Sequence, residues 1–152
     1  MKKEKIKNIW PLLAHPEPQN EDIRKFENLG TRSFPIEVSI GVSANFHQGI
    51  GSKRKEERLR YLKNYWAVKV EKIPKVKLNT SLKREYSCAI GNFIIEGMEP
   101  QQIVDKLFAD YKIYVTPIKH DEFKGVRVTP NVYTSLNDLD YFVGAVEKIA
   151  KG

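Results

Sequence analysis

The chain has 152 residues, of which 41% are hydrophobic and 30% charged, and its formal net charge at pH 7 is +7. This length suits one compact domain, or two lobes that lean on a partner. No stretch approaches the ~20 apolar residues of a membrane span, and the N-terminus lacks the apolar core of a signal peptide, so we expect no membrane partner.

The N-terminal residues predict short elements separated by breaks. Residues 2–10 are expected to form a short basic turn of helix. Three prolines make residues 11–20 an extended loop, because proline removes a backbone donor and fixes φ. Residues 27–32 form a turn with a glycine at its centre. Ser33 and Pro35 then predict the start of a helix, with the proline in its first turn.

The helix that follows is apolar nearly all round, and such helices are usually buried in a core or under a partner subunit. Its apolar residues are Ile36, Val38, Ile40, Val42, Ala44 and Phe46. Gly49 and Gly51 interrupt it. Ser52 is expected to cap a second, longer helix whose apolar residues recur at three- and four-residue intervals. Pro74 ends this part and marks the predicted domain boundary.

Beyond Pro74 the sequence alternates between strand-like and helix-like segments. Strands are expected at 76–78, 88–95, 113–118 and 126–128, and helices from Pro100 to Tyr111 and from Ser135, with Asp138 as a capping-box partner, to Ile149. The predicted fold class is α+β: a small sheet of three or four strands with two helices on one face, preceded by a helical arm and linker helix.

Few residues are suited to disulfide or metal chemistry. The single cysteine, Cys88, excludes an internal disulfide framework and fits a reducing cytoplasm. Three scattered histidines and one cysteine offer no ligand cluster with zinc spacing. We therefore expect a cytoplasmic protein without a structural metal.

The residues 125–135 combine a strand, a stop and a helix start. Arg127 lies between two valines, so it should point to one face of a strand while the valines point to the other. A planar guanidinium placed there could bind a carboxylate in two-pronged fashion. The alternative is a surface arginine extending from an edge strand.

Three motifs in this order carry a family resemblance: the glycine-threonine-arginine turn at 30–32 before an apolar helix, the glycine break with a long helix reaching Tyr65 and Trp66, and the run 125–134. The chain resembles the C-terminal part of class V aminotransferases, which are fold type I pyridoxal-phosphate (PLP) enzymes. It is most similar to the isopenicillin N epimerase-like branch. Residues 2–13 also look like the stretch that follows the cofactor lysine in these enzymes.

The resemblance implies roles for three residues. In the family, the threonine of the turn reaches the cofactor phosphate of the neighbouring subunit, which assigns this contact to Thr31, helped by the backbone amides of Gly30 and Thr31. The family's arginine that binds the substrate α-carboxylate corresponds to Arg127. Thr31 could instead be an ordinary residue before a helix, and an ion pair in solvent is favoured for Arg32.

The chain departs from the family where the chemistry is performed. These enzymes hold PLP on a Schiff-base lysine, and they supply an aspartate and a stacking ring, all upstream of the part present here. Lys119 precedes His120, whereas the family lysine follows a histidine, so we interpret Lys119 as a surface residue. The resemblance therefore implies that residues 1–73 are a remnant of the cofactor domain plus linker helix and residues 74–152 the small lobe.

Three functions follow as hypotheses. The first is the C-terminal segment of a PLP-dependent enzyme acting on an amino acid, inactive without a companion polypeptide and dimeric. The second is a non-catalytic partner of a full-length relative. The third is a basic nucleic-acid-binding module using the helix at 53–63 with Tyr61 and Tyr65, although Glu56 and Glu57 favour a solvated helix face. The sequence does not separate aminotransferase from epimerase, desulfurase or lyase chemistry.

Overall fold

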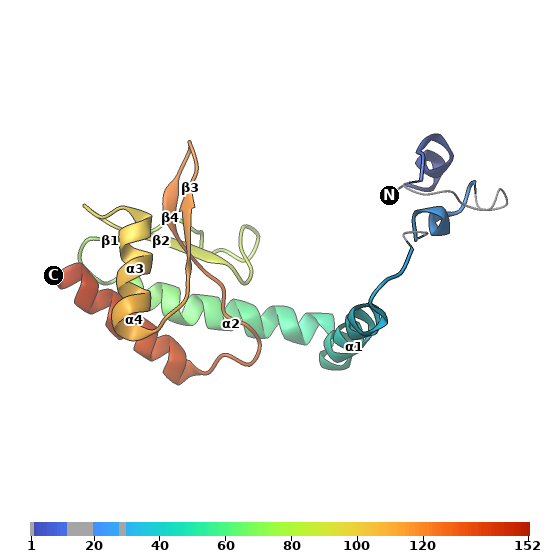
Figure 1. Ribbon diagram of the computed structural model, residues 1–152. Coiled ribbons are helices and arrows are strands. Elements are labelled where there is room, and N and C mark those ends of the chain that lie inside the picture. The colour runs from blue at the N-terminus through green and yellow to red at the C-terminus, as the bar shows by residue number, and fades with distance from the viewer. Residues whose placement is uncertain (1, 12–19, 28–29) are drawn as a thin grey trace. The chain divides into compact units, whose positions relative to one another are not determined.

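The computed structural model describes residues 2–11, 20–27 and 30–152 of the chain (Figure 1). By its contacts the chain divides into two units, Met1–Phe46 and His47–Gly152. In its described residues the first unit holds two short helices and most of a longer one. The second holds the sheet and the remaining helices.

The first unit contains the 3-10 helices η1 (Lys3–Asn8) and η3 (Ile23–Glu27). Lys25 is 3% exposed, and its Nζ donates hydrogen bonds to the carbonyls of Ile6 at 2.6 Å and Asn20 at 2.9 Å. One buried ammonium thus links the two short helices. The basic turn predicted at 2–10 is confirmed as η1, whereas most of the loop predicted at 11–20 lies outside the described residues.

Helix α1 (Phe34–Ile50) begins directly after Ser33, as the sequence predicts, but no side chain of α1 is buried by the described residues. Its large apolar side chains are 57–72% exposed: Phe34, Ile36, Val38, Ile40, Val42 and Phe46. Burial in a core is thus not seen among the described residues, and the alternative, burial under a partner subunit, stays a prediction. Within the described ranges, no helix is both long and apolar enough to cross a membrane.

The second unit is built from a four-stranded antiparallel sheet in the order β1-β2-β4-β3. Its elements are α2 (Ser52–Val70), β1 (Val76–Leu78), β2 (Gly91–Ile95), α3 (Pro100–Tyr111), β3 (Thr116–Lys119), β4 (Lys124–Val128) and α4 (Leu136–Lys151). The predicted α+β class is confirmed. Strand β2 is shorter than predicted, because residues 88–90 belong to the preceding loop.

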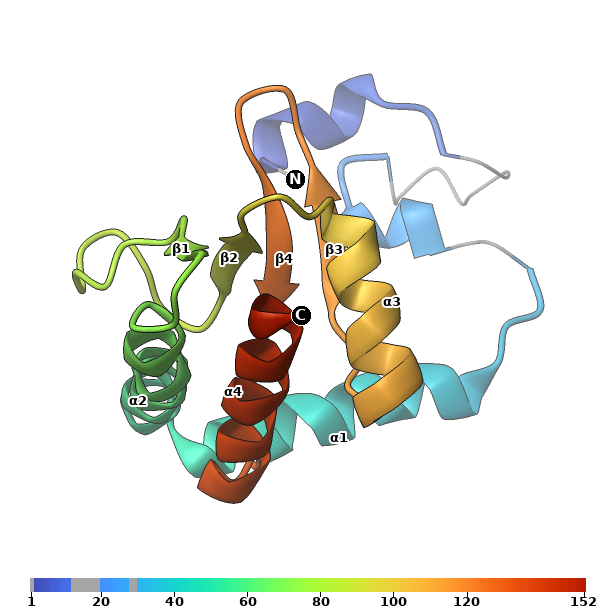
Figure 2. The same ribbon diagram turned by 90° about the vertical axis from the view of Figure 1, so that its left-hand side faces the viewer.

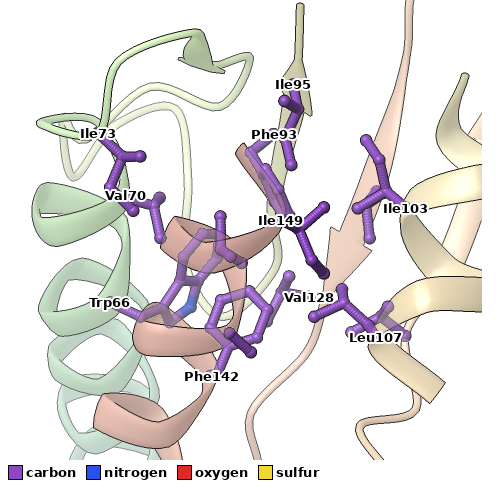
Figure 3. Packing of buried hydrophobic residues seen from close by; sticks show 14 of the residues in the cluster. Trp66, Val70, Ile73, Phe93, Ile95, Ile103, Leu107, Val128, Phe142 and Ile149 are labelled. Carbon is purple, nitrogen blue, oxygen red and sulfur yellow. The ribbon is translucent and has the colours of Figure 1, made fainter. Parts of the chain in front are cut away.

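Three helices, rather than the two predicted, cover one face of the sheet (Figure 2). The additional helix is α2, whose buried residues Leu62, Trp66 and Val70 join the same core as those of α3 and α4 (Figure 3). The rings of Trp66, Phe93 and Phe142 meet edge to face, with centroids 5.5–6.2 Å apart. The division by contacts lies between Phe46 and His47, within α1, and the domain boundary predicted at Pro74 stays a prediction.

The helix starts follow local rules. Helix α4 begins at a capping box in which Ser135 and Asp138 exchange hydrogen bonds, as predicted. The Ser135 hydroxyl is also the main reason that the pKa of Asp138 lies below its ordinary value. Helix α3 has a proline in its first turn, also as predicted. The cap of α2 is Gly51 rather than Ser52, a correction of one residue.

Gly91, at the start of β2, offers a test of the core. A Cβ placed there would lie 2.4 Å from Cζ2 of Trp66, whose side chain is fully buried. Gly91→Ala should therefore destabilise the chain by roughly 1–3 kcal/mol through overpacking. Urea unfolding followed by tryptophan fluorescence measures the change.

Gly144→Ala is the matched control, because a Cβ at this α4 position meets nothing within 4 Å. Alanine in a helix should stabilise the chain by roughly 0.5–1 kcal/mol relative to glycine. Equal free energies of unfolding for the two variants would contradict the tight contact between Trp66 and Gly91.

Candidate functional site

A cavity of about 540 Å³ lies against the sheet and is lined by residues of the second unit alone. We call it the sheet pocket, and its lining consists of Asn79, Thr80, Ile90, Asn92, Ile118, Glu122, Phe123 and Arg127. These residues come from the β1–β2 loop (79–90), strands β2, β3 and β4, and the β3–β4 turn. The lining is mixed: Ile90, Ile118 and Phe123 are apolar, and the other lining residues are polar or charged.

Strand alternation places Arg127 at the sheet pocket. Val126 and Val128 are buried in the core, while Arg127 between them is exposed, so the predicted opposition of arginine and valines is confirmed. Arg127 pairs with Asn92 of β2 and with Thr116 of β3. Among the described residues its guanidinium makes one hydrogen bond, from Nη2 to Thr116 Oγ1 at 3.3 Å. A long single bond leaves most of its five donors available to a ligand.

An amide network forms the wall of the pocket next to Arg127. Asn79 Nδ2 donates to Asn92 Oδ1 and to the Lys124 carbonyl, both at 2.8 Å. The backbone N–H of Asn92 donates to Thr80 Oγ1 at 2.9 Å. These bonds tie the start of the β1–β2 loop to the strands β2 and β4. The wall is thus held by side-chain hydrogen bonds as well as by the strand ladder.

Another part of the lining comes from the β3–β4 turn. The Phe123 ring stacks on the His120 ring, with centroids 5.6 Å apart. The backbone N–H of His120 donates to the backbone carbonyl of Phe123 at 3.0 Å. Glu122 contributes the only carboxylate in the pocket lining. The pocket therefore offers cationic and amide donors from the sheet and an acidic acceptor from the turn.

A buried lysine on α2 holds the β1–β2 loop through hydrogen bonds. Lys63 of α2 is fully buried, and its Nζ donates to Ser87 Oγ at 2.8 Å and to the Ser81 carbonyl at 3.2 Å. Burial lowers the pKa of Lys63 below its ordinary value, and the nearby Arg60 lowers it further. Arg60 itself donates to the carbonyls of Arg84 and Ser87. Lys63 therefore organises the loop and is absent from the lining of the sheet pocket.

The residues predicted to contact a cofactor phosphate lie in the first unit. Gly30 and Thr31 are both exposed, and Gly30 has a φ of 78°, a conformation that favours glycine. Two residues of the predicted turn, 28 and 29, lie outside the described residues. Arg32 forms an exposed ion pair with Glu37 at 3.0 Å, as the sequence favoured. The roles of Gly30 and Thr31 stay predictions.

Other predicted features are at the surface or engaged within the fold. Lys119 is exposed, in agreement with its interpretation as a surface residue. On the basic helix, Arg58 donates to the carbonyls of Val132 and Thr134, so part of the cationic face holds the chain together rather than facing a ligand. Among the residues that the structure describes, no group of histidine, cysteine, aspartate and glutamate could hold a metal ion.

The sequence did not single out Asn79 and Asn92 as pocket residues. Asn92 interrupts an otherwise apolar strand, and that polar interruption was the available signal. Its pairing with Arg127 depends on the strand order β1-β2-β4-β3, which joins segments far apart in the chain. Pairing of this kind is not encoded in local periodicity.

No protein-family model and no curated protein matches the chain. Solved structures do. The apo cysteine desulfurase of Thermococcus onnurineus NA1 matches 84% of this chain with a TM-score of 0.73 and 20% identity, over 34% of its own length. A NifS-like protein from Rickettsia africae matches 95% with a TM-score of 0.71 and 16% identity, over 41% of its length. Alanine–glyoxylate aminotransferase from Nostoc sp. matches 87% with a TM-score of 0.64 and 16% identity, over 35% of its length.

The chain thus spans 34–41% of the length of these structures. At such identities the likeness shows the fold. The chain therefore has the fold of one part of a fold type I PLP-dependent enzyme, as the resemblance in its sequence predicts.

Proposed function

We propose that this chain is the C-terminal segment of a PLP-dependent class V aminotransferase-like enzyme that acts on an amino acid. In this proposal Arg127 binds the substrate carboxylate, Gly30 and Thr31 contact the cofactor phosphate of a neighbouring subunit, and the chain is inactive alone. The observation that carries the proposal is the exposed Arg127 in a mixed polar and apolar pocket of a fold shared with such enzymes. A guanidinium is suited to a carboxylate because its planar fork matches both oxygens.

The partner in this proposal is a polypeptide that supplies the cofactor lysine, the aspartate and the stacking ring. Its support is α1, whose apolar side chains are exposed on more than one side. Monomeric proteins rarely leave apolar surface of this extent in contact with water. We propose an assembly of at least two chains, located in the cytoplasm as the lone Cys88 favours, and of the isopenicillin N epimerase-like branch.

The residues present fit only part of the cofactor. The exposed hydroxyl of Thr31 and the backbone amides beside it suit a phosphate. The two buried lysines, Lys25 and Lys63, donate to carbonyl and hydroxyl oxygens of this chain, and neither lines the sheet pocket. PLP supplies an electron sink at Cα of an amino acid when it is bound. The part of the reaction assigned to this chain is to hold and orient the carboxylate.

A second candidate function uses the same surface. In it the chain is a non-catalytic partner that docks through α1 on a full-length relative. The exposed apolar residues of α1 support both readings equally. Nucleic-acid binding is the less favoured alternative, because Arg58 and Arg60 of the basic helix are bonded to carbonyls within the unit.

The chain alone should not turn over. Incubated with PLP and an amino acid, it is expected to show neither transamination nor racemisation, because no lysine of the described pocket can hold the cofactor. Chromatographic analysis of keto-acid product and of amino-acid enantiomers measures both. Turnover by the isolated chain would contradict the proposal.

The positive arm co-expresses the chain with polypeptides encoded directly upstream of its gene. A companion that carries a cofactor lysine should co-purify with the chain, show the absorbance of bound PLP and restore turnover. If a full-length relative binds the chain and its activity does not depend on Arg127, the non-catalytic partner is the correct function.

In the assembled enzyme, Arg127→Ala should raise KM for the amino acid by about 10- to 100-fold, the effect of losing a charged hydrogen bond of roughly 1.5–3 kcal/mol. The melting temperature should stay nearly unchanged, because Arg127 is exposed. Arg54→Ala, which removes an exposed arginine from α2 outside the pocket lining, is the control. Equal KM values for the two variants would remove Arg127 from the site.

A further inference from the structure

We propose that Asn92 is a second recognition residue of the sheet pocket, whose side-chain N–H binds the same carboxylate as Arg127. The inference rests on the proposed role of Arg127. The two residues are directly opposite on neighbouring antiparallel strands. Side chains of such pairs project to the same face, with Cβ atoms about 4.5–5.5 Å apart. The two side chains are therefore close enough to share one carboxylate.

The hydrogen-bond network decides which atom of the Asn92 amide is available. Asn79 points its Nδ2 at the Lys124 carbonyl, since an amide oxygen in that place would face another oxygen. The same Nδ2 donates to Asn92 Oδ1 at 2.8 Å. The oxygen of Asn92 is thereby engaged, and its Nδ2 is left as the other end of the amide.

That nitrogen has no hydrogen-bond acceptor in the part of the chain that the structure describes. Asn92 is 7% exposed, and a buried donor without a partner is unfavourable, so an acceptor that reaches it gains a hydrogen bond. Because Nδ2 is shielded from solvent, a carboxylate reaches it when a neighbouring group of the pocket moves. Arg127 is held by one 3.3 Å bond to Thr116, which leaves it able to reorient toward the same anion.

Gly125 leaves space for the Asn92 amide in this position. A Cβ at Gly125 would lie 2.1 Å from Asn92 Oδ1 and 2.7 Å from the Phe93 carbonyl. The absence of a side chain on β4 therefore leaves room for the amide to lie across the strand beside Arg127. The glycine, the two asparagines and the arginine form one recognition surface.

The arrangement favours planar carboxylates over other small anions. A guanidinium offers paired donors, and the neutral amide adds one directed N–H without adding charge. Glu122 lies in the same lining and should repel a second carboxylate on the ligand. The expected ligand class is therefore a monocarboxylate, which includes amino acids with uncharged or cationic side chains.

The test is a titration of the ¹⁵N-labelled full chain with sodium propionate, followed by ¹H–¹⁵N NMR at constant ionic strength maintained with sodium chloride. Propionate should shift the side-chain NH₂ signals of Asn92 and the Nε–H signal of Arg127 with one common saturation curve. Succinate should bind more weakly than propionate. Movement of the Arg127 signal without the Asn92 signal would overturn the inference and leave the role of Arg127 intact.

Two variants complete the test. Asn92→Ala should raise the Kd of propionate about tenfold or more, the usual effect of losing a hydrogen bond to a charged group. Asn64→Ala is the matched control: it removes an asparagine of α2 that also has an unbonded buried atom but lies outside the pocket lining. If circular dichroism shows that Asn92→Ala does not fold, the NMR titration of the unsubstituted chain, read from the Asn92 and Arg127 signals, decides whether Asn92 binds the carboxylate.

Identical Kd values for Asn92→Ala and Asn64→Ala would also overturn the inference. If propionate shifts neither Asn92 nor Arg127, both lose their carboxylate role in this chain. The companion experiment tests cofactor binding independently, so the two failures are distinguishable.

Discussion

The packing of the second unit depends on the contact between the indole of Trp66 and the backbone of Gly91. The ring lies where a Cβ of residue 91 would be, and it meets Phe93 and Phe142 edge to face. This contact brings α2 onto the same face of the sheet as α3 and α4. Because all three helices cover that face, the other face is left for the loop and the turn that line the pocket. The position of the pocket is thus a consequence of core packing.

The opposite face of the sheet, which carries the pocket, is also shaped by strand alternation and by a glycine. Strand alternation sends Val126 and Val128 into the core and Arg127 to the pocket. A second glycine, Gly125, opens space on the pocket side, where the Asn92 amide lies. The core glycine admits an aromatic ring and the pocket glycine admits an amide. Residues without side chains thereby set the shape of both faces.

Local patterns were sufficient for most elements of the second unit. The capping box at Ser135, the proline start of α3 and the valine–arginine alternation each depend on neighbours within a few residues. The placement of α2 was missed because a helix with periodic apolar residues can cover any apolar face, and the periodicity does not say which. Asn92 was missed for a related reason: its importance arises from a strand partner that is distant in the sequence. The predicted contacts of Gly30 and Thr31 with a cofactor phosphate rest on the resemblance alone.

The two units make different demands on a partner. The second unit has a continuous core of its own, to which α2, α3, α4 and the sheet all contribute. In the first unit the described buried residues are Ile6 and Lys25, and every large apolar side chain of α1 in that unit is exposed. Burial of apolar area is the main source of folding free energy, so the second unit has a source of stability of its own, whereas the described residues provide α1 with none. The proposed substrate recognition accordingly falls in a unit with its own core. The residues predicted to contact the cofactor lie beside the helix that lacks one, and their arrangement is therefore expected to depend on the proposed partner of α1.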